Sequence, residues 1–243
     1  MDLIETTNNS FRHPWELSRS RSILKSIKDL KDTWPVIADI GAGDSFFTSQ
    51  LCSITDNKVF AVDTEYDGND SVKNGIIYLN DITMLNDNSI DCMIMMDVLE
   101  HIKNEEAFIE SALRKLRIGG RLLITVPALQ RLFSSHDTFL KHYRRYNRKQ
   151  IIDLLARHDV HLERDHFFYS SLLIPRLISL VSEKLNLIKN DNSGIGMWKY
   201  EENSLFTKII YYLLLFDFSF HRFLSKTPIR FPGLSLLFIY RKN

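Results

Sequence analysis

Short apolar runs alternate with helical patterns over the first two thirds of the chain. The runs predict strands at 36–40, 59–63, 76–79, 91–96 and 121–126, and apolar positions at helical spacing predict helices at 14–31, 46–54, 103–117 and 148–157. The helix at 103–117 should stop at Gly119-Gly120. Strands that alternate with helices predict a parallel sheet covered by helices on both faces, with a ligand at the carboxyl ends of the strands.

The pattern changes after residue 166. Two long apolar stretches, 167–187 and 205–224, read as helices separated by the polar linker 189–196, and an apolar strand follows Pro232. The predicted units are an N-terminal helical cap (1–34), a core (35–168), a helical insertion (169–231) and a final strand (232–243). The insertion could be a plain cap packed on the sheet, a lid, a dimer interface or an amphipathic membrane contact, and we favour a lid or dimer cap.

Composition narrows the classes of function. The 243 residues carry a net charge of +1, which gives no strong field for nucleic acid. Two cysteines imply no disulfide framework, and Cys92 reads as a buried small hydrophobe. Residues 1–10 form a loose start without a signal-peptide pattern, and the apolar runs are too short to span a bilayer. We therefore expect a cytoplasmic protein.

A glycine turn is the most informative motif. The strand at 36–40 leads into Gly41-Ala42-Gly43-Asp44, and the next strand ends in Asp63. Glycines permit a tight turn and close approach of a ligand, and an acid at the next strand end can accept two ribose hydroxyls. The motif predicts a nucleoside-type cofactor.

The residues around the turn narrow the choice of cofactor. A dinucleotide motif needs a third glycine where Phe46 stands, and no P-loop pattern occurs. Asp39 and Asp44 flank the turn and would repel a pyrophosphate, whereas they suit a ligand with a positive amino group. S-adenosylmethionine (SAM) has an amino group, a sulfonium and a ribose, and it has no phosphate.

The chain resembles the class I SAM-dependent methyltransferases at motifs that occur in family order over residues 35–165. They are Asp39-Ile-Gly41-Ala42-Gly43, Asp63, Asn80-Asp81-Ile82, Met96-Asp97-Val98-Leu99-Glu100-His101, and Leu116 to Pro127. The resemblance implies a Rossmann-like, doubly wound α/β fold with a seven-stranded, mostly parallel sheet whose last strand is antiparallel. Ser45 stands where many members have a third glycine, which predicts an ordinary φ there.

The resemblance also implies the roles of the cofactor-binding residues. Asp39, Gly41, Ala42 and Gly43 would meet the methionine moiety, Asp63 the ribose, Thr64, Asp81 and Ile82 the adenine, and Asp97 and Val98 the sulfonium. In a subset of bacterial members the first helix closes over the cofactor, so Trp15 and Arg19 could touch the SAM carboxylate or roof the pocket. The alternative for Trp15 is an aromatic staple between helix and core.

A second polar segment, 135–146, follows the fifth strand. His136 or His142 could be a general base, because an imidazole titrates near neutrality. Arg144 and Arg145 could hold a carboxylate or phosphate of the acceptor. The alternative is a surface loop before a helix capped by Asn147. The segment resembles the same bacterial subset, whose acceptors are mostly unassigned.

The sequence thus predicts a methyltransferase acting on an O or N nucleophile of a small-molecule or lipid- or saccharide-type acceptor. The rivals are a nucleotide-dependent oxidoreductase and a non-catalytic SAM-binding protein. We expect no metal, since nothing completes a zinc spacing with His158 and His161. We expect no nucleic-acid partner and no transmembrane segment, while peripheral membrane contact and a homodimer through the insertion remain open.

Overall fold

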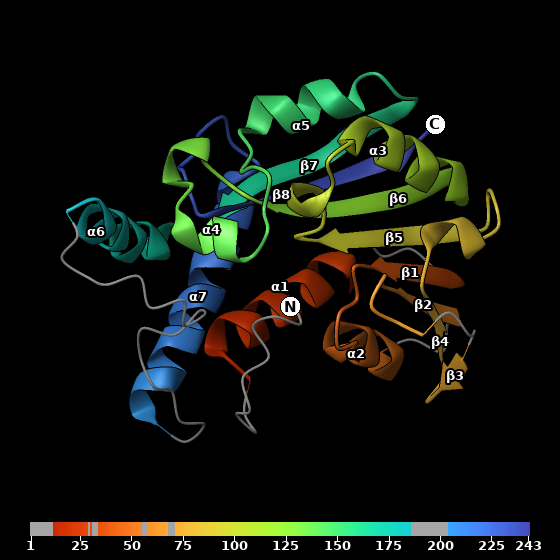
Figure 1. The fold of residues 1–243 in the computed structure, drawn as a ribbon, viewed down its shortest axis with the longest axis horizontal. Helices are drawn as coiled ribbons and strands as arrows, with labels where there is room; N and C mark the ends of the chain where they lie inside the picture. The colour runs from red at the N-terminus through yellow and green to blue at the C-terminus, as the bar shows by residue number, and fades with distance from the viewer. Residues whose placement is uncertain (1–11, 29, 31–33, 55–57, 68–70, 186–203) are drawn as a thin grey trace.

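The computed structural model describes residues 12–28, 30, 34–54, 58–67, 71–185 and 204–243 (Figure 1). The predictions for residues 1–10 and for the linker 189–196 lie outside this part of the chain. The described residues form one sheet in the order β3-β4-β2-β1-β5-β6-β8-β7. Its strands are β1 (Val36–Ile40), β2 (Lys58–Val62), β3 (Ser71–Lys73), β4 (Ile76–Leu79), β5 (Ile90–Met96), β6 (Leu116–Pro127), β7 (Val160–Phe168) and β8 (Ser235–Lys242).

The centre of the sheet is parallel, as predicted. β4, β2, β1, β5 and β6 run in one direction, and the final strand β8 lies antiparallel between β6 and β7. The described residues have eight strands rather than the expected seven, because β3 adds a short antiparallel edge next to β4. All three β3 residues are exposed, so no apolar run in the sequence marked this strand.

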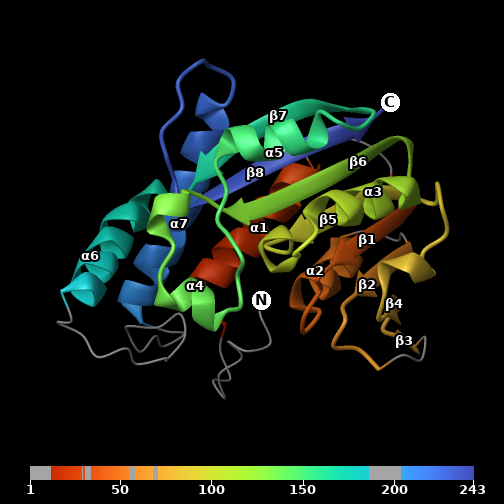
Figure 2. The ribbon, with the colours of Figure 1, turned by 45° about the horizontal axis from the view of Figure 1, so that its top comes forward.

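Helices cover both faces of the sheet (Figures 1 and 2). On one face α1 (Pro14–Lys28), α2 (Phe46–Ile54) and α7 (Leu205–Leu224) share a core cluster with strand residues such as Ile94 and Ile239. On the other face α3 (Glu105–Lys115) and α5 (Arg148–Leu155) pack with Met93 and Phe238. Cys92 is fully buried on the α1 side, as predicted.

The first residue of α3 is determined by a local capping residue, whereas its last residue is determined by the start of β6. Asn104 caps the helix by accepting a hydrogen bond from the backbone N–H of Ala107. The expected glycine stop is wrong: α3 ends at Lys115, and Gly119 and Gly120 lie inside β6. A Cβ on Gly120 would come within 2.9 Å of the Arg117 carbonyl oxygen, so this glycine serves close packing in the strand.

The segment after β7 is helical in part. The prediction for 205–224 matches α7, whereas the stretch 167–187 contains the end of β7, a 3-10 turn at Ser170–Leu172 and the shorter helix α6 (Leu173–Lys184). Buried Leu214 and Phe218 on α7 belong to the same core cluster as α1. None of the helices in the described part of the chain combines the length and apolar character that a bilayer span requires.

Candidate functional site

Three carboxylates lie at the ends of adjacent strands. Asp39 is the penultimate residue of β1, and Asp63 and Asp97 directly follow β2 and β5. Because these strands are parallel neighbours, their carboxyl ends meet at one edge of the sheet, the usual ligand position in such folds.

The glycine turn after β1 is shaped by a close contact with residues 97–101, which directly follow β5 and are called the β5 exit. Gly41 has a φ of +70°, and a Cβ at this position would lie 2.5 Å from Cγ2 of Val98. Gly43 also has a positive φ, of 53°, and its N–H donates to Oδ2 of Asp63 at 2.7 Å. Gly41 therefore packs on Val98, and Gly43 is hydrogen-bonded to Asp63, without a ligand.

Ser45 corrects the prediction of an ordinary backbone at that position. Its φ is +60°, in the left-handed region that favours glycine. The turn thus keeps the glycine-type conformation although a serine occupies it. The Ser45 N–H donates to the Ala42 carbonyl, and the Ser45 carbonyl accepts from Ser49 N–H in α2, so the surrounding hydrogen bonds fix this backbone.

Asp39 is almost fully buried. Its carboxylate accepts a hydrogen bond from the Thr48 hydroxyl at 2.5 Å, and burial raises the pKa of Asp39 to about 7. A positive group near this carboxylate would favour its ionised form. Asp39 therefore suits a cationic ligand group better than an anionic one.

Asp97 has a left-handed φ of 55°, and its carboxylate is held from two sides. Thr125 on β6 donates its hydroxyl to Oδ1 at 3.1 Å, and Arg19 on α1 forms an ion pair with Oδ2. The Arg19 guanidinium also lies 4.1 Å from the ring centre of Trp15. These contacts join α1 to the β5 exit. They are compatible with both predicted roles of Trp15, a roof over the cofactor and an aromatic staple, because its ring also contacts the Tyr169 ring.

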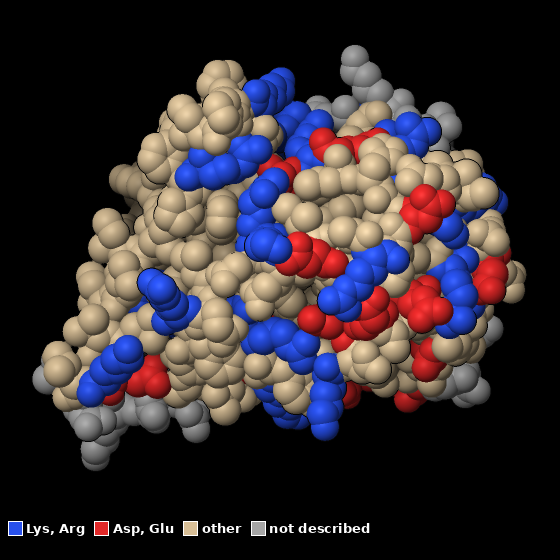
Figure 3. All heavy atoms as spheres, turned by 90° about the horizontal axis from the view of Figure 1, so that it is seen from above, with Lys and Arg blue, Asp and Glu red and all other residues tan. Residues whose placement is uncertain are grey.

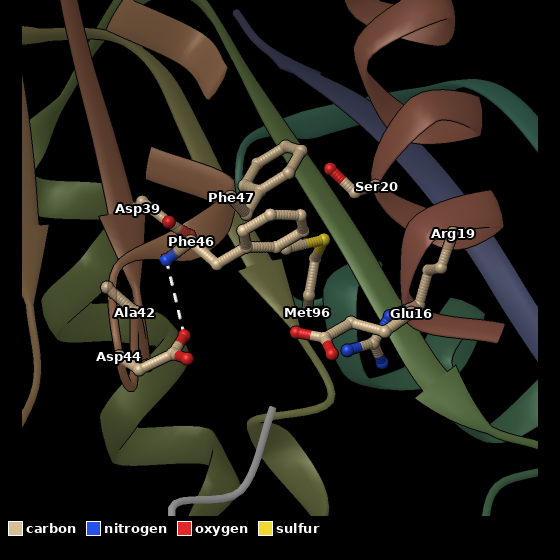
Figure 4. A pocket seen from close by; sticks show the side chains of 10 residues that line it. Glu16, Arg19, Ser20, Asp39, Ala42, Asp44, Phe46, Phe47 and Met96 are labelled. Carbon is tan, nitrogen blue, oxygen red and sulfur yellow. Dashed lines mark hydrogen bonds between the residues drawn. The ribbon is translucent and has the colours of Figure 1, made fainter. Parts of the chain in front are cut away.

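A pocket lies between α1 and the glycine turn (Figure 4). It holds about 370 Å³ of non-protein space, part of it open to solvent. Four of the residues predicted to contact the cofactor line this pocket: Arg19, Asp39, Gly41 and Ala42. Asp44, which the sequence placed beside the turn, also lines the pocket, whereas five lining residues were not predicted: Glu16, Ser20, Phe46, Phe47 and Met96.

The signal for two of the missed residues was present in the sequence. Glu16 and Ser20 lie one helical turn apart on the face of α1 that carries Arg19, and Figure 4 shows α1 facing the turn across the pocket. Arg12 pairs with both Glu16 and Asp44, which links the start of α1 to the glycine turn. Glu16 stands only four residues from Arg12, whereas the tertiary structure alone brings Asp44 to it.

The remaining predicted cofactor residues lie around the β2 and β4 ends. Besides Gly43 N–H, Asp63 accepts the Glu65 N–H at 3.0 Å. Thr64 is exposed beside it. Exposed Asp81 caps a 3-10 turn (η2, Ile82–Met84) by accepting from Thr83 N–H. Hydrogen bonds from the Thr83 side chain and from its backbone N–H lower the pKa of Asp81. Ile82 is buried in the same cluster as Val98.

Segment 135–146 is organised around one buried carboxylate. Asp137, in α4 (Ser135–Phe139), bonds to the Arg145 and Arg176 guanidinium groups at 2.7 and 2.8 Å, and lies 3.3 Å from Nδ1 of His142. Burial alone would raise the pKa of Asp137, but these hydrogen bonds and charges hold it well below its usual range. Arg145 therefore serves this network, and Arg176 ties α6 to the segment.

The two candidate bases lie in different surroundings. Burial lowers the pKa of His136. His142 packs edge-on against His101, with ring centres 4.6 Å apart, and Glu100 joins them to bring three ligand-type atoms within 4.8 Å of one another. This group could hold a metal ion, whereas His158 and His161 lie beside Glu106 and Asn243.

Arg144 pairs with Glu105 at 3.0 Å and donates to the Lys103 carbonyl. Tyr146 is buried, and its hydroxyl lies 3.0 Å from the Leu99 carbonyl oxygen and 2.5 Å from Oε2 of Glu105, the two acceptors available to its one proton. Asn147 caps α5 in a capping box with Gln150, as predicted. Segment 135–146 thus packs against the β5 exit, on the side where the sulfonium pocket was expected.

The donor set fits SAM. The acids that line the pocket, Glu16, Asp39 and Asp44, suit an amino group and a sulfonium. The Gly41–Val98 contact and the Asp63 carboxylate complete the edge on which a nucleoside would rest. No cluster of cations for a pyrophosphate lines the described pocket.

Comparisons with known proteins agree with this fit. Residues 38–124 match the family described as "Methyltransferase domain". Structural neighbours include a SAM-dependent methyltransferase from Archaeoglobus fulgidus (TM-score 0.53, 14% identity, 94% of each chain covered). Another is Haemonchus contortus phosphoethanolamine N-methyltransferase 2 in complex with SAM (TM-score 0.53, 21% identity). That alignment covers 96% of this chain and 54% of the neighbour. No curated protein matches.

The solved structures share the fold of this chain, the Rossmann-like α/β fold. The domain match covers the glycine turn, the β5 exit and most of β6, so residues 38–124 form a methyltransferase domain, and SAM is the cofactor that this domain and the site support.

Proposed function

We propose that this enzyme transfers the SAM methyl group to an oxygen or nitrogen nucleophile of a small-molecule or lipid- or saccharide-type acceptor. One observation carries the proposal. The acceptor-site candidates His136 and His142 lie in segment 135–146. This segment packs on the β5 exit, which begins at Asp97, and the Tyr143 N–H donates to the Glu100 carbonyl there. That arrangement supports an acceptor that enters over the strand ends.

Each predicted cofactor residue has a role in this proposal. Gly41, Ala42 and Gly43 pass beneath the methionine moiety, and Asp39 influences its amino group through water or backbone. Asp63 accepts the ribose hydroxyls with the lone pairs that Gly43 and Glu65 leave over. The others act as follows: Thr64, Asp81 and Ile82 at the adenine, Asp97 and Val98 beneath the sulfonium, Trp15 and Arg19 over the carboxylate.

The bound cofactor supplies a methyl electrophile that is already activated, so positioning provides much of the rate. The chain's own task is to orient the acceptor and, where the acceptor must lose a proton, to accept it. We assign that step to His136 or His142. We assign anion binding on the acceptor to Arg144, at the edge of the segment, with Glu105 as its partner in the free enzyme.

We also propose that residues 1–34 and 169–231 cover the core at 35–168, and that the second cover acts as a lid, with a dimer cap as the alternative. Light scattering across a range of protein concentrations tests the homodimer.

The test of the function is a screen of hydroxyl- and amine-bearing metabolites, lipids and sugars, read out as S-adenosylhomocysteine formation. Calorimetry of SAM and of NADH runs in parallel. Turnover with one acceptor class supports the proposal. SAM binding without turnover on any class would favour a non-catalytic binding protein, and binding of NADH in place of SAM would favour an oxidoreductase.

A further inference from the structure

Exposed apolar side chains concentrate on one part of the molecule. Of the large hydrophobic residues that are exposed in the described chain, all but Val72, Met84, Ile118 and Tyr143 lie between residues 174 and 231. A surface of this kind marks a contact with another body rather than ordinary solvent exposure.

Helix α7 carries the larger share. Its inner stripe packs on α1 and the sheet through residues that include Leu214 and Phe218. Its outer stripe recurs at helical spacing along the whole helix: Leu205, Ile209, Tyr212, Phe216, Phe220 and Phe223, each 43–75% exposed. The helix is therefore apolar on a side that the described protein does not cover.

Helix α6 repeats the pattern on a smaller scale. Ile174, Ile178 and Val181 are each more than half exposed. α6 is fixed to segment 135–146 by Arg176, which binds Asp137 and the Ser134 hydroxyl. The apolar surface thus borders the segment where we place the acceptor.

The exposed charged side chains of α6, α7 and residues 225–231 are all cations. The acids of the two helices are Glu183 and Asp217, and both accept backbone N–H bonds, from Ser135 and from Tyr169 and Ser171. The exposed cations are Lys184, Lys208, Lys226 and Arg230. In Figure 3 the side of the molecule that carries α6 is mostly uncharged, with blue cations and little red.

From this combination we infer that the outer faces of α6 and α7 form a surface that rests on an anionic lipid bilayer. Aromatic and aliphatic side chains enter the headgroup boundary, and lysines at the rim meet lipid phosphates. Neither helix can cross the bilayer, so the contact lies in its plane. A second copy of the chain fits less well, because both copies would bring the same cations to the interface and lysine is depleted there.

The test is co-sedimentation of the full chain with vesicles. We expect binding to phosphatidylcholine mixed with phosphatidylglycerol, and weaker binding to phosphatidylcholine alone or at high salt, since screening weakens the charge contribution. The double variant Phe216→Ser/Phe220→Ser should lower the affinity by about tenfold or more, the loss expected for two partly buried phenyl rings. Val72→Ser, which changes an apolar residue on β3 that is 73% exposed, is the control.

SAM binding by each variant confirms that it folds, and it separates this inference from the proposed reaction, since vesicle binding requires no turnover. Absence of binding to the mixed vesicles would overturn the inference. So would equal binding by the parent and the Phe216→Ser/Phe220→Ser variant, or a dimer in light scattering that this variant dissolves.

Discussion

Asp63 has two tasks at once. Each carboxylate oxygen accepts one backbone N–H, from Gly43 or Glu65, and so shapes the turn that the ribose would reach. The structure therefore makes this side chain part of the loop as well as a predicted ligand contact, and a test must separate the two.

We predict that Asp63→Ala weakens SAM binding by about 2–4 kcal/mol, the loss expected for hydrogen bonds to a charged group. Calorimetry measures the affinity. Asp63→Asn keeps an acceptor for Gly43 N–H and should bind better than Asp63→Ala, while exposed Asp67→Ala should bind like the parent. Unchanged affinity in Asp63→Ala would remove the ribose assignment.

For the acceptor side, His142→Ala and Arg144→Ala should lower turnover while SAM affinity stays nearly constant. The reason is geometric, because the predicted cofactor contacts come from α1 and the β1, β2, β4 and β5 ends. Loss of a general base lowers turnover by about 10²–10⁴-fold. Exposed Lys141→Ala in the same segment is the control. Full activity in both variants would make the segment plain surface.

If His136 is the base, the acid limb of the activity profile follows from its surroundings. The base acts when unprotonated, so activity falls as pH drops through its pKa. Burial lowers the pKa of His136, which places the limb below the usual value of about 6.5. The pH dependence of kcat, with and without His136→Gln, measures it. A limb above that value would exclude His136 from this role.

At the scale of elements, a single carboxylate organises α4, the following loop and α6. Asp137 is fully buried, and its partners Arg145 and Arg176 are largely buried as well. The sequence showed a dense polar segment, but it did not show that Asp137 and Arg145 form an ion pair with each other.

Asp137→Ala should therefore destabilise the protein by about 3–5 kcal/mol, the usual loss when one member of a buried ionic group is removed. Chemical denaturation measures the free energy of unfolding. Asp153→Ala removes an exposed carboxylate that pairs with exposed Lys149 and should change stability by less than about 1 kcal/mol. Similar losses in the two variants would show that the network adds no stability.

At the scale of the whole molecule, α7 belongs to the core as much as to the insertion. Phe218 is 2% exposed and packs edge-on against Phe168 of β7, with ring centres 5.3 Å apart. Without lipid, Phe218→Ala should cost about 3–5 kcal/mol of folding free energy, whereas Phe216→Ala, 68% exposed on the same helix, should cost little. Thermal or chemical unfolding compares them. A small loss in Phe218→Ala would mean that the sheet folds independently of α7.

Much of the architecture was readable from the chain. The strands at 36–40 and 76–79 and the helices at 46–54 and 205–224 match the predicted ranges, because their apolar periods and turn residues are local signals. The edge strand β3 escaped detection, since its exposed residues carry no such period, and α3 ended early because β6 begins at Leu116.

The sequence by itself determined the fold class, the glycine turn and the carboxylates at the strand ends, since alternation and spacing place residues on faces and tips. Only the tertiary structure decided the partners. Arg19 meets Asp97 across 78 positions, and Asp137 meets Arg176 across 39. The left-handed φ of Ser45 was likewise decided by its surroundings. A local pattern indicates which side of a helix or strand is polar. The distant charged residue that pairs with that side depends on how the helices pack across the sheet.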